Sequence, residues 1–303
     1  MSKSAGLFAL CALLLVSATW PSRANGQSVA PKQAGDASAQ LSFIPELDRG
    51  FHELYELKFK EARARFTAWE GLNPTAPLGP ALEAAADLFE EFYRKGVLTS
   101  EFFLNDKRLL GGIEGKPDAD LETSFAAAAQ RSENLARQRL AVDPNDADAL
   151  FALTLSAGMR SDNASLLEKK QMESLGFMRE ADVSAKKLLA VTPEADDAYL
   201  ALGAANYIIG ILPGYKRALL RMGGVRGDRT AGIEQLQRAA ASGHYLRPYA
   251  KLMLALAELR EKHPDLARAQ LEQLAAEFPD NPLFGAELAK AAAAANRNPP
   301  PGD

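Results

Sequence analysis

The side chains most able to do chemistry are few and poorly grouped in this chain of 303 residues. The three histidines, His52, His244 and His263, have no partner histidine four residues away and no cysteine beside them, so their spacing does not match a zinc site. The run 111–116, GGIEGK, lacks the first glycine and the final Ser or Thr of a phosphate-binding loop. No GxSxG sequence that would present a nucleophilic serine occurs. We therefore expect a protein that is not an enzyme and that uses no metal and no cofactor.

One segment has an unusual charge. Between positions 216 and 229 five bases occur with a single acid, Asp228, although the whole chain has a formal charge of −4. The bases are Lys216, Arg217, Arg221, Arg226 and Arg229. Such a cluster can hold an acidic segment or a phosphate. The other interpretation is a solvated face, or a set of ion pairs with acidic neighbours.

The first residues have the pattern of an export signal. Lys3 gives a positive start, and the unbroken apolar run 7–16 is shorter than the about 20 residues that a membrane-spanning helix needs. Ser22 and Ala24 place small residues where signal peptidase cleaves. We predict a signal peptide over residues 1–24 and an exported protein, periplasmic or secreted. Cleavage after Ala18 and an uncleaved anchor are the alternatives.

Removal of residues 1–24 would leave an acidic chain without cysteine. Lys3 and Arg23 leave with the signal and no acid does, so the formal charge changes from −4 to −6. Cys11, the one cysteine, is also lost, and with it any disulfide or thiolate. An acidic chain with no long basic block is poorly suited to nucleic acid, and we expect no such partner. Residues 25–40 are predicted to be a flexible linker and residues 296–303 a disordered tail, because both are small and polar.

Residues 41–295 have a helical pattern almost throughout. Ala, Leu, Glu, Arg and Gln dominate, and alternating runs of β-branched residues are missing. Pro74, Pro144, Pro193 and Pro279 each follow the end of an expected helix, since proline lacks the N–H group and disfavours helix before it. Asp or Asn comes soon after three of these prolines and can cap the next helix. The sequence therefore predicts an all-α chain.

Small and large residues recur in these helices at fixed spacing. In the segment 248–281 they are Leu254, Ala255, Ala267, Leu271, Leu274 and Pro279. A second fragment has Tyr199, Leu202, Gly203 and Tyr207 in the same phase. On these residues the chain resembles the tetratricopeptide repeat (TPR) family, whose unit is a pair of helices in about 34 residues. The resemblance implies an exported bacterial TPR protein, folded as a right-handed α-solenoid of helix pairs, that binds a protein or peptide partner.

The prolines are too far apart for 34-residue units alone. The extra residues fall near 97–117, 159–172 and 210–228, in each case between the first and second helix of a pair. The segment 242–245, SGHY, departs in another way, because it lacks the proline that closes the other repeats. We expect the three insertions to lie along one edge of the solenoid, which is often a binding face.

Two surfaces are candidates for partner binding. One is the insertion edge, with Tyr215, Lys216, Arg217, Arg221 and Arg226, and the other is the concave face around Phe151 and Tyr207. The leading hypothesis is a non-enzymatic scaffold for protein–protein interaction at the cell envelope, with no stable transmembrane segment after signal removal. The alternative is a binding module for an apolar or anionic small ligand, held between the superhelix and its insertions. A closed pocket floored by residues 199–212 would favour the alternative.

The leader gives the first testable prediction. Because its apolar run is short and ends near small residues, the processed protein should begin at Asn25. N-terminal sequencing of the protein recovered from cells checks this. An intact Met1 in the membrane fraction would contradict it.

Overall fold

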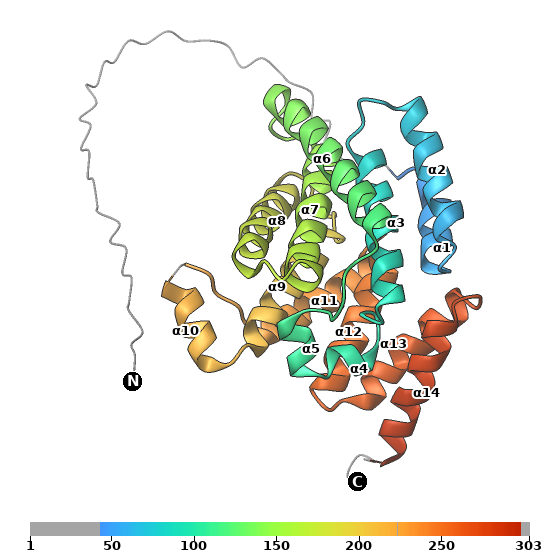
Figure 1. Ribbon diagram of the computed structural model, residues 1–303, viewed down its shortest axis with the longest axis vertical. Coiled ribbons are helices and arrows are strands. Elements are labelled where there is room, and N and C mark those ends of the chain that lie inside the picture. Colours follow the sequence, from blue (N-terminus) through green and yellow to red (C-terminus); the bar gives the residue numbers. More distant parts are fainter. Residues whose placement is uncertain (1–42, 223, 298–303) are drawn as a thin grey trace, which may run out of the picture. The chain divides into compact units, whose positions relative to one another are not determined.

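The computed structural model describes residues 43–222 and 224–297. The predicted signal peptide and linker lie outside these residues, as do residues 298–303 of the predicted tail. The described part of the chain holds fourteen α-helices and one π-helical turn, and no strand (Figure 1). The helices are α1 (Pro45–Tyr55), α2 (Phe59–Leu72), α3 (Leu78–Arg94), α4 (Ser100–Phe103), α5 (Asp106–Gly111), α6 (Ala119–Val142), α7 (Ala147–Asp162), η1 (Asn163–Leu167), α8 (Gln171–Val191), α9 (Ala198–Ile211), α10 (Gly214–Met222), α11 (Arg229–Ser242), α12 (Arg247–Arg260), α13 (Pro264–Glu277) and α14 (Pro282–Arg297). The all-α prediction is confirmed. None of the described helices combines the length and the apolar character that spanning a bilayer requires.

Short polar side chains fix where several helices begin. The Oδ1 atoms of Asp118, Asp146 and Asp228 each accept a hydrogen bond from the backbone N–H three residues later, at 3.2, 2.9 and 3.0 Å. These caps start α6, α7 and α11. Asn281 does the same for the first turn of α14, by accepting from the N–H of Leu283 at 2.8 Å. Asp197 precedes α9 in the same way, but its side chain accepts no hydrogen bond from that helix.

The helices pack in pairs, and the pairs contact one another in series. The pairs are α1 with α2, α3 with α6, α7 with α8, α9 with α11, and α12 with α13, and α14 packs on α13. Successive pairs meet through α2 and α3, α6 and α7, α8 and α9, and α11 and α12. Leu254, Ala255, Ala267 and Leu271, which the repeat pattern assigned to the packing positions, are all buried. The repeat phase read from the sequence therefore agrees with the packing.

Each insertion lies between the two helices of its pair, as the spacing predicted. They are α4 with α5, then η1, and then α10 (Figure 1). The first two touch, since the N–H of Ile113 donates to the carbonyl oxygen of Leu166 at 2.8 Å. The first insertion also extends beyond its own pair. Phe103 stacks on Tyr207 of α9, and the guanidinium of Arg260 in α12 donates to the carbonyl oxygen of Phe103 at 2.9 Å. This insertion therefore belongs to the core as well as to an edge.

The N-terminal pair packs against the turn between α11 and α12, far away in the sequence. The hydroxyl of Tyr245 in this turn accepts a hydrogen bond from the N–H of Ile44 at 2.8 Å, and its carbonyl oxygen accepts one from the Tyr55 hydroxyl at 2.9 Å. The ring of Tyr245 stacks on Phe51, with centroids 4.8 Å apart, and lies 6.3 Å from Phe151 of α7. One residue thus joins the first pair, the third pair and the start of the last pair.

Asp197 holds that turn in place. Its buried carboxylate accepts hydrogen bonds from the backbone N–H groups of residues 244, 245 and 246 at 2.8–3.0 Å. Burial raises the pKa of Asp197, and the three N–H groups act in the opposite direction by stabilising the charged form. A proline in this turn would remove a donor, which explains why the segment 242–245 has none.

Glycines set the spacing of α9 and α11. A Cβ atom built on Gly232 would lie 2.5 Å from the backbone nitrogen of Tyr207, a distance that real Cβ atoms do not show. Gly203, on the facing helix, is equally constrained by the backbone nitrogen of Leu236 at 2.9 Å. Because the obstacles are backbone atoms, the two helices would have to separate to accept a side chain.

This contact gives a stability prediction. Gly232→Ala should lower the free energy of unfolding by about 1–3 kcal/mol, because the added methyl overpacks the helix interface. The control is Gly176→Ala, in α8, where the new methyl meets nothing within 4 Å. That change should raise stability by about 0.5–1 kcal/mol through helix propensity alone. Urea denaturation measures both; equal midpoints for the two variants would contradict the packing described here.

Candidate functional site

Phe151 and Tyr207, the two residues proposed for the concave face, are fully buried. Phe151 lies against Tyr245, and Tyr207 is covered by Phe103 of the first insertion, with centroids 6.2 Å apart and nearly parallel rings. The Tyr207 hydroxyl donates to Oε1 of Glu261 at 3.0 Å. Burial raises the pKa of Tyr207, and the neighbouring Glu261 carboxylate raises it further. In this structure neither aromatic ring is open to a partner.

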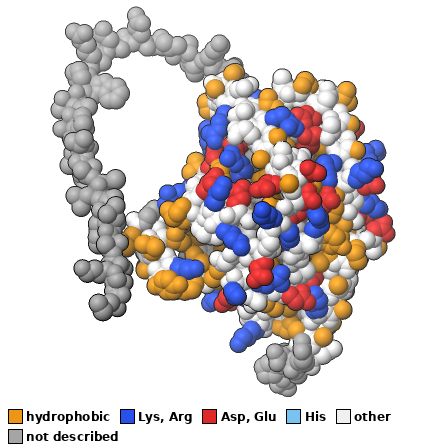
Figure 2. Space-filling view, in the orientation of Figure 1, with side chains coloured by type: hydrophobic (Ala, Val, Ile, Leu, Met, Phe, Trp, Pro, Cys, Tyr) orange, Lys and Arg blue, Asp and Glu red, His pale blue; other side chains and the backbone are white. Residues whose placement is uncertain are grey.

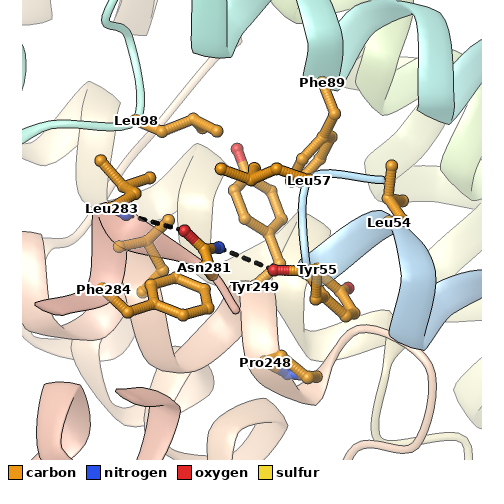
Figure 3. A pocket seen from close by; sticks show the side chains of 11 residues that line it. Leu54, Tyr55, Leu57, Phe89, Leu98, Pro248, Tyr249, Asn281, Leu283 and Phe284 are labelled. Atoms are coloured by element: carbon orange, nitrogen blue, oxygen red, sulfur yellow. Dashed lines mark hydrogen bonds between the residues drawn. The ribbon is translucent and has the colours of Figure 1, made fainter. Parts of the chain in front are cut away.

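A small cavity lies where the first and last helix pairs meet (Figure 3). Its volume is about 10 Å³, enough for at most one water molecule. Its walls are mainly apolar and include Tyr55, Phe89 and Tyr249. Asn281 closes one side by donating to the carbonyl oxygen of Tyr55 at 2.7 Å. This space is a packing gap and not a ligand site.

Asp162 is an unusual carboxyl group. It ends α7 where the chain continues into the π-helical turn η1, and it is partly buried. Its side chain makes no hydrogen bond or ion pair with any residue that the structure describes. Burial alone raises the pKa of Asp162 to about 7. Burial also raises the pKa of Tyr249, and the charge of Asp162 raises it further.

The histidines and most buried acids have structural partners. His244 lies 2.6 Å from Asp48, and His263 lies 2.8 Å from Glu258. Glu133 pairs with the guanidinium of Arg160 at 2.6 Å. Among residues 43–222 and 224–297, no three His, Cys, Asp or Glu side chains are placed to hold a metal ion. These groups serve packing between neighbouring helices.

The third insertion exposes most of its side chains. Helix α10 and the residues just after it form a surface that we call the α10 patch: Tyr215, Lys216, Arg217, Leu219, Arg221, Met222 and Arg226. Its apolar members are 73% (Tyr215), 69% (Leu219) and 87% (Met222) exposed. In Figure 1 the helix lies apart from the helix pairs, and Figure 2 shows hydrophobic and basic side chains together at that place.

The charges of the α10 patch are mostly unpaired. Arg217 donates to the carbonyl oxygen of Gly210 at 3.3 Å, and Arg229, just beyond the patch, lies 3.3 Å from Glu261. Lys216, Arg221 and Arg226 have no ion pair or hydrogen bond within the described part of the chain. The interpretation of this segment as a set of ion pairs with acidic neighbours thus holds for Arg229 and not for these three.

An open groove lies on the surface beside α6. Its volume is about 370 Å³, and it runs between the end of α6, the turn after it and Thr75 in the turn before α3. Leu135 and Val142 supply its apolar wall, and Val142 is 88% exposed. Arg139 and Asp146 form an ion pair of 2.7 Å at its side. The groove thus joins an apolar strip to a fixed pair of opposite charges.

Comparisons with known proteins assign the chain to no family. No protein family model matches the chain, and no curated protein matches it. Among solved structures, it is similar to a thermophilic TPR protein of Thermus thermophilus, with 17% sequence identity and a TM-score of 0.45. That similarity covers 82% of this chain and 97% of the other.

Nothing in the sequence indicated the groove or the environment of Asp162. The residues of the groove are ordinary helix and turn residues, and a π-helical turn has no sharp local signature. The contact between Asp197 and the turn is reflected in the sequence. The segment 242–245 lacks the proline found in the other repeats, and N–H groups of this turn donate hydrogen bonds to Asp197.

The raised pKa of Asp162 predicts a pH dependence of stability. Between about pH 4, the ordinary aspartate range, and pH 7 the folded protein keeps a proton that the unfolded chain releases. Stability should therefore fall as pH rises through this window and level off above it. Asp162→Asn removes the titrating group, so the variant should gain about 1–4 kcal/mol relative to wild type between pH 4 and pH 8.

Urea denaturation of both proteins across that pH range measures the difference. The control is Asp265→Asn, which changes an exposed carboxylate in the first turn of α13. A constant difference between wild type and Asp162→Asn at all pH values would show that this carboxyl is not buried as described.

Proposed function

We propose that the protein is a non-enzymatic scaffold that is exported to the cell envelope and binds another protein there. The stack of TPR-like helix pairs supports this, because such stacks present extended surfaces and not closed catalytic pockets. Export rests on the leader at residues 1–24. The described titratable groups are mostly engaged in structural pairs, which fits a binding role.

The size of the open spaces favours a protein partner over a small ligand. The small cavity beside Tyr249 has about 10 Å³, whereas the open groove beside α6 has about 370 Å³. Small-molecule sites commonly occupy about 300–1,000 Å³ and bury most of the ligand. The groove has the volume but is open to solvent, so a small ligand would stay largely exposed there. A segment of a larger partner can cover the groove and remain anchored outside it.

The lining of the groove matches such a segment. Among the residues that line it, Val142 and Leu135 offer apolar contact, and Gln138 and Asp143 offer hydrogen-bonding groups. Exposed apolar residues surrounded by polar ones are typical of protein interaction surfaces. The groove is the observation that carries the proposal.

The proposal predicts that Val142 contributes to partner binding. Val142→Asp should reduce the amount of captured partner at least about fivefold, since a desolvated charge replaces an apolar contact. Folding should be unaffected, because the side chain is 88% exposed. Affinity capture from envelope extract with the purified protein measures this.

The matched control is Val183→Asp, on α8, where the same residue type is 65% exposed and is not among the residues that line the groove. A protein captured by wild type and by this control, and lost with Val142→Asp, supports the groove. Equal capture by all three proteins would contradict it.

A further inference from the structure

The exposed apolar side chains of α10 form one stripe. Tyr215, Leu219 and Met222 are spaced four and three residues apart, so they share one face of the helix. All three are more than two-thirds exposed. No described helix packs against this face. Few soluble surfaces place three large apolar side chains in one row on so short a helix, and such a patch marks an interaction site.

The residues of α10 that are partly covered, Lys216 and Leu220, lie to one side of the stripe. Leu220 is half-buried, and its carbonyl oxygen accepts a hydrogen bond from the N–H of the buried Val225 at 2.9 Å. Gly224, with φ of +79°, completes this turn. Arg217 holds the start of the helix through the carbonyl oxygen of Gly210. These two contacts hold the ends of the helix, and the apolar stripe between them is exposed.

Basic residues border the stripe on both sides. By the helical period, Lys216 lies on one flank and Arg221 on the other, and Arg226 follows just after the helix. Of the five bases in the segment 216–229, these three have no ion pair or hydrogen bond with a residue that the structure describes. The one acid of the segment, Asp228, is occupied in capping α11. The surface of α10 is thus apolar along the stripe and positive on both sides of it.

We infer that the α10 patch docks the protein onto an anionic lipid surface. An outward apolar stripe with Lys and Arg at its borders is the arrangement by which amphipathic helices lie in a bilayer interface, with the apolar side chains among the acyl chains and the bases at the phosphate groups. Tyr215 has the amphipathic ring that favours the headgroup level. The inference goes beyond protein binding at the groove and uses none of the groove residues.

Two features favour a lipid surface over an acidic protein segment. Helix α10 projects from the helix pairs (Figure 1), and its three apolar side chains are all more than two-thirds exposed, so a flat surface can reach them together, whereas a protein partner would need a groove to match. The acidic net charge of the chain does not prevent docking, because charges more than about 8–10 Å apart are screened at physiological salt.

Vesicle binding tests the inference. The probes are vesicles of phosphatidylcholine alone and vesicles that also contain phosphatidylglycerol, with binding measured by flotation at low and high salt. Wild type should bind the anionic vesicles at least about tenfold more than the neutral ones, and less at high salt. Because residues 7–16 are themselves apolar, wild type and variants are compared in the same purified form of the chain.

Two pairs of variants isolate the patch. Leu219→Ser with Met222→Ser should lower binding about tenfold, while Met172→Ser with Val183→Ser, which changes exposed apolar residues on α8, should not. Arg221→Glu with Arg226→Glu should abolish the preference for anionic vesicles. Lys60→Glu with Lys107→Glu changes the net charge equally at other exposed positions and should leave most of the preference.

Three results would overturn the inference: no difference between the two vesicle types, equal losses in the test and control variants, or binding of an acidic amphipathic peptide to the patch without any binding to vesicles. The last result would assign the patch to a protein partner. Capture of a partner at the groove is unaffected by any of them, so the two proposals fail separately.

Discussion

The structure depends on one buried carboxylate, Asp197, and the turn that it holds. Three successive backbone N–H groups donate to it, and together they fix the position of Tyr245. A residue in a turn would normally be mobile, but here its ring, hydroxyl and carbonyl oxygen all have fixed partners. The three donors offset part of the penalty of burying the charge, although burial is the larger effect and leaves the pKa of Asp197 raised.

Closure through Tyr245 decides which surfaces remain available. An open stack of helix pairs would expose the inner faces of its first helices. In this chain the N-terminal pair and the first insertion cover those faces, so Phe151 and Tyr207 become core residues. The cavity left beside Tyr249 is too small for a ligand. The surfaces that remain available for binding are the groove beside α6 and the α10 patch.

Local sequence patterns predicted the helices but did not predict the contacts between residues far apart in the sequence. Proline landmarks, small residues at packing positions and the surplus spacing placed the helix pairs and all three insertions. These signals act within one pair. The hydrogen bond from Ile44 to Tyr245 joins residues 201 positions apart, and no periodicity in a single sequence reports such a contact. The concave face was therefore expected to be open. The basic cluster on α10 was visible in the sequence, but the outward direction of its apolar side chains was not.

Apolar side chains are closely packed in the interior but exposed on α10. Glycines at 203 and 232 bring α9 and α11 into backbone contact, and aromatic rings fill the space between distant pairs. The large apolar side chains of the interior are therefore buried closely. Yet α10, inserted between those same two helices, leaves Leu219 and Met222 exposed, whereas Lys216 and Leu220 are half-buried. The hydrogen bonds from Val225 to Leu220 and from Arg217 to Gly210 hold the two ends of α10 in the free protein. The stripe is thus already arranged before it meets a surface, which reduces the entropy lost on docking.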